Sequence, residues 1–213
     1  LGAAIWRSVM SGKLILIRHG ESEWNALGKW TGWTDVSITE EGARLSRELG
    51  EKLRDTPIDI AYDSELRRTK ETVDAGLGGA GKTDVERHES GAINERDYGV
   101  YTGMLKEEVK AEIGDEAYLA LRRGWDRPIE NGESLKDVYS RALPFYLQTI
   151  VPELRAGKNI LIVGHGNSLR ALLKYIEYIS YEDISSTEFA HNCAIVYTVN
   201  EDGRQDTKDV VEL

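Results

Sequence analysis

Two histidines beside glycines are the residues in this sequence best suited to chemistry. His19 lies in Arg18-His19-Gly20-Glu21-Ser22, directly after the apolar run Lys13–Ile17. Neutral imidazole is a good nucleophile toward phosphorus, glycine lets the backbone approach a ligand closely, and the planar fork of arginine matches phosphate oxygens. The alternative is a structural histidine hydrogen-bonded in a turn, with Arg18 on the surface. The tripeptide alone favours this structural interpretation.

The second histidine changes that balance. His165 lies in Gly164-His165-Gly166-Asn167-Ser168, after the apolar run Asn159–Val163 and before a helical pattern. The free N–H groups at the start of a helix favour an anion, and open α/β sheets bind ligands beyond the carboxyl ends of their strands. Both histidines follow such strands, so one sheet edge can bring them together. The pair therefore indicates an anion site in which His165 stabilises a phosphoryl group in transit.

Further cations and one carboxylate complete this candidate site. Arg68 follows the apolar run Ile58–Tyr62, and Lys106 and Arg122-Arg123 come later in the chain. The chain has 27 basic and 37 acidic residues and a net charge of −10, so these cations must converge to hold a polyanion. For each alone, a solvated helix charge is the default. Glu95 is the preferred proton donor and acceptor, and the alternative is a surface Glu–Arg pair in a turn.

Alternating strands and helices would position these residues. We expect strands at Lys13–Ile17, Ile58–Tyr62, Thr83–Arg87, Asn159–Val163 and Ala194–Val199. We expect helices at Thr39–Arg54, Ser64–Leu77 with Ser64 as N-cap, Leu105–Ile113, Asp115–Arg123, from Ser134 to about Pro152 with bends at Pro144 and Pro152, and from Gly166 through Tyr178. This order predicts an α/β fold, a three-layer α/β/α arrangement around a mostly parallel central sheet, formed by one catalytic domain at 13–213.

The composition excludes several classes of function. A net charge of −10 repels nucleic acid and anionic membranes, and no apolar run approaches the roughly 20 residues that span a bilayer. The single Cys193 allows no internal disulfide and fits a reducing compartment, so we expect a cytoplasmic protein. Residues 1–12 are interpreted as the end of a leader, an added segment or a native extension, and they are left out of the fold prediction.

Two other patterns are rejected. Gly76 to Thr83 matches the phosphate-loop pattern, but a helical pattern precedes it and a strand-like run follows, which is the reverse of what that motif requires. His191 and Cys193 are two soft ligands without a second pair, and His88 lies far away in sequence, so they predict no zinc site. We therefore expect no metal.

Taken in order, the motifs resemble the cofactor-dependent phosphoglycerate mutases of the histidine phosphatase superfamily. A lone Arg-His-Gly is weak, but the collinear set is very specific and covers nearly everything from Lys13 to about Tyr197. The matching segments are Leu16 to Asn25, Thr31-Gly32-Trp33, Ser64-x-Leu66-x-Arg68, Asn94-Glu95-Arg96-x-Tyr98-Gly99, Arg122-Arg123, Gly132 to Leu135, and Gly164 to Arg170.

The resemblance implies a phosphoglycerate mutase-like fold and the interconversion of 3-phosphoglycerate and 2-phosphoglycerate in glycolysis and gluconeogenesis. His19 would become a phosphohistidine, with Arg18, Arg68 and His165 around the phosphoryl group and Glu95 moving the proton. The implied cofactor is 2,3-bisphosphoglycerate as phosphoryl primer, without a metal, and the implied partner is a small phosphorylated three-carbon acid. The implied substrate-binding residues are Ser22, Asn25, Thr31, Gly32, Arg96, Tyr98, Lys106, Arg122, Arg123, Gly166 and Asn167.

Two alternatives stay open. A phosphomonoester hydrolase would use the same fold with water as acceptor. Lys106 and Arg122-Arg123 speak against it. The short end of the sequence at Leu213 speaks for it, because many relatives carry there a mobile tail that helps to exclude water from the active site. A non-catalytic protein that binds phosphorylated metabolites is disfavoured because binding alone needs no pair of histidines with Glu95. The segment from Trp125 to Glu133 is shorter than in long-form mutases, which favours a monomer or small homo-oligomer.

Overall fold

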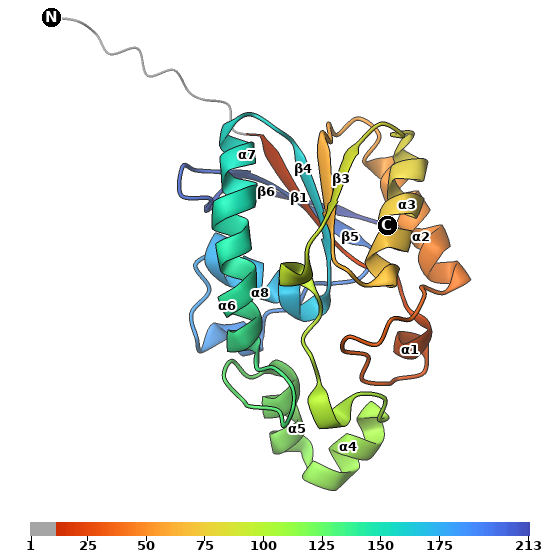
Figure 1. Ribbon diagram of the computed structural model, residues 1–213, viewed down its shortest axis with the longest axis vertical. Coiled ribbons are helices and arrows are strands. Elements are labelled where there is room, and N and C mark those ends of the chain that lie inside the picture. Colours follow the sequence, from red (N-terminus) through yellow and green to blue (C-terminus); the bar gives the residue numbers. More distant parts are fainter. Residues whose placement is uncertain (1–11) are drawn as a thin grey trace, which may run out of the picture.

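Six strands form one central sheet in residues 12–213, the part of the chain that this computed structural model describes (Figure 1). Their spatial order is β3-β2-β4-β1-β5-β6; β1 to β4 run parallel, β5 pairs antiparallel with β1, and β6 pairs antiparallel with β5. The mostly parallel sheet expected from the sequence is confirmed. The strands are β1 (Lys13–Arg18), β2 (Ile60–Asp63), β3 (Glu86–Glu89), β4 (Ile160–Gly164), β5 (Cys193–Val199) and β6 (Gln205–Glu212).

Helices cover both faces of this sheet. Leu14 and Leu16 of β1 belong to one apolar cluster, and Ile15 and Ile17 belong to another, because successive side chains of a strand point to opposite faces. The helices α2 (Glu40–Lys52) and α3 (Arg67–Ala80) pack on the Ile15 side. The opposite face is covered by α6 (Leu135–Phe145), η3 (Tyr146–Ile150), α7 (Val151–Arg155) and α8 (Gly166–Ile176).

A separate helical layer lies beyond the carboxyl ends of the parallel strands, at the bottom of Figure 1. It contains α4 (Lys106–Ile113) and α5 (Asp115–Arg123), packed around a third cluster that includes Trp30, Val109 and Leu121. Short elements connect it to the sheet: α1 (Glu23–Ala26), η1 (Gly91–Ile93), η2 (Gly99–Tyr101) and η4 (Asp183–Ser185). This layer faces the sheet edge at which β1 and β4 end.

The predicted helix that starts at Ser134 is confirmed, and its two prolines shape it. The Ser134 hydroxyl accepts a hydrogen bond from the backbone N–H of Asp137 at 3.2 Å. In return, the Asp137 carboxylate accepts from the Ser134 backbone N–H at 2.9 Å, as a capping box requires. Between Pro144 and Pro152 the chain widens into the π-helical segment η3. Because a proline ring clashes with the carbonyl four residues earlier, the wider turn accommodates Pro152 without ending the helix.

Several sequence expectations need correction. Ser64 is not the N-cap of α3: the helix begins at Arg67 after Leu66, and the Ser64 hydroxyl accepts from the Leu66 N–H at 3.1 Å. Helix α8 ends at Ile176 instead of Tyr178, and β3 begins at Glu86 instead of Thr83. Strand β6 follows the strand that was expected to be the last one.

No helix within residues 12–213 has the length and apolar character needed to span a bilayer. Of the excluded segment 1–12, residues 1–11 lie outside the described part.

Candidate functional site

The two histidines meet at the sheet edge. His19 follows β1 and His165 follows β4, and these strands are parallel neighbours with Arg18 opposite Gly164. The His19 N–H donates to the Gly164 carbonyl at 3.0 Å, and the two imidazole rings lie 4.9 Å apart, centroid to centroid. The sheet register therefore brings the two motifs together, as the sequence predicted.

Hydrogen bonding fixes the tautomer of His19. Its Nδ1 lies 2.7 Å from the Gly20 carbonyl oxygen, which can only accept, so Nδ1 carries the proton and Nε2 keeps a free lone pair. Burial, together with the positive charges of Arg68 and Arg18, lowers the pKa of His19 well below its ordinary value of 6.5. The side chain is therefore a neutral nucleophile at physiological pH.

The ring of His165 is held at both nitrogens. Arg68 donates from Nε to Nδ1 at 3.2 Å, so Nε2 carries the proton and donates to the Ser64 hydroxyl at 2.8 Å. Burial and the charge of Arg68 lower the pKa of His165 well below 6.5. His165 is thus a fully buried, neutral ring of fixed orientation, next to the ring of His19.

Arg68 connects the histidines to the loop after α1. It stands in the first turn of α3 and is 1% exposed. Besides His165, its guanidinium donates to the carbonyl oxygens of Gly32 at 2.8 Å and Thr34 at 3.0 Å. Arg18 is anchored by one bond, from Nη1 to the Phe189 carbonyl at 3.2 Å, and its buried Nε has no partner within residues 12–213. Arg18 therefore keeps donors available for a ligand.

Glu95 projects into the same space from the segment between η1 and η2. Its Oε1 accepts from the N–H groups of Arg96 at 2.7 Å and Asn167 at 3.2 Å, and from the Asn167 side chain at 3.1 Å. Asn167 lies in the first turn of α8, so the start of that helix holds the carboxylate. Asn167 also donates to the Tyr98 hydroxyl at 2.9 Å.

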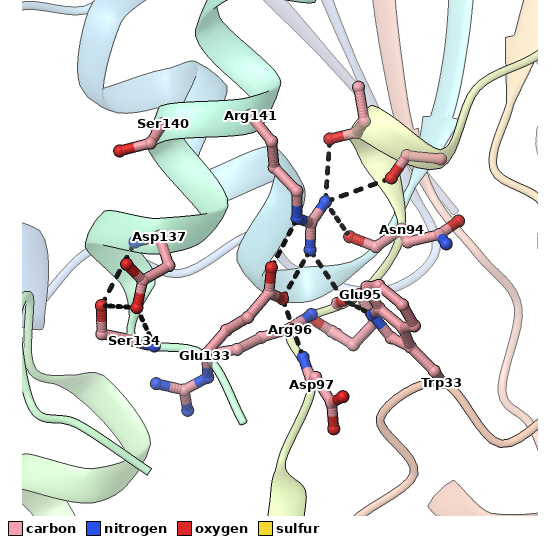
Figure 2. A network of polar contacts seen from close by, with 12 residues as sticks. Trp33, Asn94, Glu95, Arg96, Asp97, Glu133, Ser134, Asp137, Ser140 and Arg141 are labelled. Atoms are coloured by element: carbon pink, nitrogen blue, oxygen red, sulfur yellow. Dashed lines mark hydrogen bonds and ion pairs between the residues drawn. The ribbon is translucent and has the colours of Figure 1, made fainter. Parts of the chain in front are cut away.

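Figure 2 shows how the backbone around Glu95 is fixed. Arg141 points from α6 and donates to the carbonyl oxygens of Ala92 at 2.8 Å, Asn94 at 3.0 Å and Glu95 at 2.9 Å. Two further bonds of 2.8 Å join Arg141 to the carboxylate of Glu133. On the other side, the Trp33 indole N–H donates to the Glu95 carbonyl at 2.6 Å. The carboxylate of Glu95 is thus presented by a backbone that is held from two sides.

These groups line a cavity of about 660 Å³, its open mouth included, between the sheet edge and α4–α5. Seven lysines and arginines line it and only two glutamates, although the whole chain carries a net charge of −10. The lining residues are Arg18, His19, Asn25, Lys29, Trp30, Thr31, Arg68, Glu95, Tyr98, Lys106, Arg122, Arg123, Gly166, Asn167, Arg170, Glu188 and Phe189. The excess of positive charge makes this a site for an anion.

Four of the expected site residues do not line the cavity. His165 lies behind His19, and Gly32 offers its carbonyl to Arg68. The Ser22 hydroxyl caps α1, where it accepts from the Asn25 N–H. Arg96 is fully buried and points away, donating to the Leu121 carbonyl at 3.0 Å at the end of α5.

Five lining residues lay outside the sequence prediction: Lys29, Trp30, Arg170, Glu188 and Phe189. Arg170 stands inside the segment that matches the mutases, so that match pointed to it without giving it a role. Its guanidinium donates to the Asn167 side chain at 2.9 Å, to the Arg123 carbonyl at 2.9 Å and to the Ile184 carbonyl at 2.7 Å. Arg170 therefore ties the end of α5 to the start of α8.

His191 also lies near the site, although its sequence context gave it no role. Its ring centroid is 6.1 Å from that of His19, and it lines an adjoining hollow that shares Arg18, Asn25, Lys106, Arg122 and Glu188 with the cavity. Burial and the charge of Arg18 lower the pKa of His191 to about 4. Within residues 12–213, no group of three or more histidine, cysteine, aspartate or glutamate side chains is arranged to hold a metal ion.

Comparison with known proteins relates this site to a family. The model of the histidine phosphatase superfamily (branch 1) matches residues 14–212. The 2,3-bisphosphoglycerate-dependent phosphoglycerate mutase of Bradyrhizobium diazoefficiens is 43% identical over 191 residues, covering 89% of this chain and 92% of that protein. The enzyme of the same name from Bartonella tribocorum is 41% identical over 204 residues, covering 95% and 99%.

Solved structures share the fold. A mycobacterial glucosyl-3-phosphoglycerate phosphatase, in complex with VO3, superimposes with a TM-score of 0.82 at 20% identity, covering 95% of this chain and 99% of that one. The alpha-ribazole phosphatase from Shigella flexneri has a TM-score of 0.74 at 26% identity, covering 88% and 91%. The mutase-like fold expected from the motifs is confirmed by these likenesses.

Proposed function

The chain belongs to branch 1 of the histidine phosphatase superfamily, and from this premise we propose that it is a 2,3-bisphosphoglycerate-dependent phosphoglycerate mutase. The observation that carries the proposal is a second group of cations, Lys106, Arg122 and Arg123, which line the same cavity as His19. In hydrolysis, the alcohol left after phosphoryl transfer departs and water takes its place as acceptor. A mutase must also hold the carboxylate and second phosphate of its substrate. Relatives of that name at about 40% identity support the assignment.

In the proposed reaction, Nε2 of His19 attacks the phosphorus of a phosphate ester. A P–N bond forms at His19 while the P–O bond to the sugar acid breaks. Arg18 and Arg68 stabilise the negative charge on the phosphoryl oxygens, and His165 keeps Arg68 oriented through its Nδ1. Positioning and electrostatic stabilisation supply most of the rate, because phosphoryl transfer needs little other covalent work from the protein.

Glu95 moves the proton in each direction. It protonates the departing ester oxygen when His19 takes up a phosphoryl group, and it accepts the proton of the attacking hydroxyl when His19 returns one. Loaded His19 donates its phosphoryl group to the free hydroxyl of a monophosphoglycerate, and it then takes up the other phosphoryl group of the resulting bisphosphorylated acid, which leaves as the isomer. The three hydrogen bonds to Oε1 of Glu95 fix the carboxylate for this exchange.

The cavity residues fit 2,3-bisphosphoglycerate. Nε of Arg18 and the hydroxyl of Thr31 are buried without a hydrogen-bond partner in residues 12–213, and both residues line the cavity. With Lys106, Arg122 and Arg123 they would hold the phosphates and carboxylate of this compound. When bound, it supplies the phosphoryl group that first loads His19. The proposal involves no metal.

The first test is a product analysis. Enzyme is incubated with 3-phosphoglycerate and a trace of 2,3-bisphosphoglycerate, and 2-phosphoglycerate and free phosphate are measured in the same tube. We expect rapid isomer formation with little phosphate, and loss of both products in His19→Ala. Full mutase activity in His19→Ala would contradict the mechanism.

A phosphomonoester hydrolase is the second candidate. It is favoured by the likeness to the alpha-ribazole phosphatase, which has 26% identity and the same fold. Release of phosphate without isomer in the product analysis would establish this alternative. If neither product formed and labelled 2,3-bisphosphoglycerate left no phosphohistidine, the site would be one for binding alone.

A further inference from the structure

The three cations on the α4–α5 side of the cavity differ in their pairing. Within residues 12–213, neither Lys106 nor Arg122 has an ion-pair partner. Burial and the charges of Arg122 and Arg18 lower the pKa of Lys106, as expected for a cation surrounded by cations. Arg123, in contrast, is paired: its Nη2 lies 3.0 Å from Oε1 of Glu188. Of the three cations on this side of the cavity, Arg123 is therefore already in contact with a carboxylate of the protein, that of Glu188.

Glu188 comes from the irregular segment between η4 and β5. Its side chain is 57% exposed, and it lines both the main cavity and the adjoining hollow. The next residue anchors this segment, because the Phe189 carbonyl accepts from Arg18. Partial burial opposes ionisation, but the hydrogen bond from Arg123 and the charges of Arg123, Arg122 and Arg18 lower the pKa of the Glu188 carboxyl below its ordinary value. Glu188 is therefore an anion at neutral pH.

We propose that Glu188 is a specificity-determining residue that occupies the second anion subsite of the cavity. A ligand with a single phosphoryl group at His19 leaves the Glu188–Arg123 pair intact. A ligand with a second anion on the α4–α5 side must displace Glu188 from Arg123 or bind beside its negative charge. Glu188 thus weakens the binding of two-anion ligands relative to one-anion ligands. The inference rests on the proposed function only in taking that side as the place of the second anion.

Two phosphonates that differ in one group test this idea directly. Propylphosphonate carries one anionic group, and 3-phosphonopropionate carries a carboxylate in addition, on a chain of the same length. Their C–P bonds are not cleaved by phosphoryl transfer, so calorimetric titration at low ionic strength measures binding whether or not the protein is a mutase. The variant is Glu188→Gln. Glu182→Gln, which makes the same change of net charge at an exposed residue outside both cavities, is the control.

We expect Glu188→Gln to lower the Kd of 3-phosphonopropionate by about fivefold, the scale of one partly exposed ion pair, and to change that of propylphosphonate by less than about twofold. Glu182→Gln should leave both constants near those of the wild type. If the Kd values of both ligands fell equally, or if both variants lowered the Kd of 3-phosphonopropionate equally, the effect would be general charge repulsion. Either result would overturn the proposal. Weaker binding of 3-phosphonopropionate by Glu188→Gln would also overturn it, because Glu188 would then hold Arg123 in place for the ligand.

The failure of this proposal is distinguishable from failure of the proposed function. A protein that releases phosphate without isomer can still bind 3-phosphonopropionate more tightly in Glu188→Gln. A true mutase can equally show no change in that variant. If 3-phosphonopropionate binds no better than propylphosphonate to either protein, the α4–α5 cations hold no second anion, and Glu188 has no subsite to occupy.

Discussion

Arg68 and Ser64 together fix which ring nitrogen of His165 carries the proton. Arg68 can only donate, so the hydrogen bond to Nδ1 requires the proton of His165 to lie on Nε2, where the Ser64 hydroxyl accepts it. The same hydroxyl accepts from the Leu66 N–H at 3.1 Å and contacts the Thr69 hydroxyl at 2.9 Å. A single buried oxygen thus joins the start of α3 to the histidine pair.

Ser64→Ala should therefore cost more than an ordinary serine substitution. It leaves the buried Nε2–H of His165 without an acceptor, for which we expect a loss of about 1–3 kcal/mol in the free energy of unfolding, measured by urea titration. Ser140→Ala is the matched control, because its exposed hydroxyl bonds only within α6 at 2.8 Å, and it should change stability by less than about 0.5 kcal/mol. Equal effects of the two variants would mean that His165 finds another acceptor.

At the scale of residues, sequence reasoning reached the groups that belong to local motifs. His19 and His165 each follow an apolar strand, and the geometry brings them together. Glu188 has no such context: it is a glutamate in an irregular segment, and only the path of the chain before β5 brings it to Arg123. Ser64 was misassigned because a serine before a helix usually caps that helix, whereas its partner here is 101 positions away.

Among the elements, α6 has a role beyond covering the sheet. Arg141 reaches from this helix to the carbonyl groups of Ala92, Asn94 and Glu95, and Glu133 holds the arginine in place. Five donors in a rigid plane suit this geometry, and the single ammonium group of a lysine cannot reproduce it. Helix α6 thus positions the proposed proton donor without touching the cavity.

Arg141→Lys should consequently impair steps that need Glu95 more than steps that do not. We expect kcat for isomerisation of 3-phosphoglycerate to fall by about ten- to a hundredfold, because small displacements of a catalytic group are costly. The first-turnover burst of p-nitrophenolate from p-nitrophenyl phosphate reports transfer to His19 with a leaving group that needs no proton, and its rate should change far less. Arg155→Lys, which also replaces an arginine that bonds a backbone carbonyl, controls for general damage. An equal fall for both substrates would show that Arg141 supports the fold and does not act through Glu95.

The strands that the sequence did not predict, or predicted with the wrong bounds, are edge strands whose position depends on pairing with a neighbouring strand. Strand β6 is mostly exposed and contains three charged residues in the run Asp206 to Asp209, so it lacks the apolar alternation that predicts a strand. It exists because a turn after Asn200 returns the chain to pair with β5. Strand β3 is likewise an exposed edge, which explains its shifted start. The buried strands β1 and β4 were located to within one residue.

Across the whole molecule, the balance of charge is opposite inside and outside the cavity. The chain carries ten more acidic than basic residues, yet seven cations and two glutamates line the space between the sheet and α4–α5. The net charge follows from the composition but this separation does not, because the cations come from six separate places in the chain and converge only on folding. Burying several cations and three histidines beside one another keeps those histidines neutral, and this has a consequence for stability.

That consequence is a loss of stability in mild acid. His19, His165 and His191 have pKa values lowered in the folded protein, mainly by burial, and in the unfolded chain they return to about 6.5. Below pH 6.5 the unfolded state therefore binds more protons than the folded state, so the free energy of unfolding falls as pH falls, by about 1.4 kcal/mol per pH unit for each histidine. For His191 this window closes near pH 4. Carboxyl groups with lowered pKa values, such as Asp59 and Asp137, act mainly below their ordinary value of 3.8.

Urea unfolding measured between pH 8 and pH 4.5 should show this decline beginning near pH 6.5, with a slope of more than one proton. His191→Gln should remove about one proton from the slope while leaving the decline due to His19 and His165. His88→Gln, at an exposed histidine paired with Glu86, controls for the removal of a surface histidine. A free energy of unfolding that stays constant down to pH 5 would mean that the buried histidines take up protons in the folded state, and that His19 is not held neutral by Arg68 and Arg18.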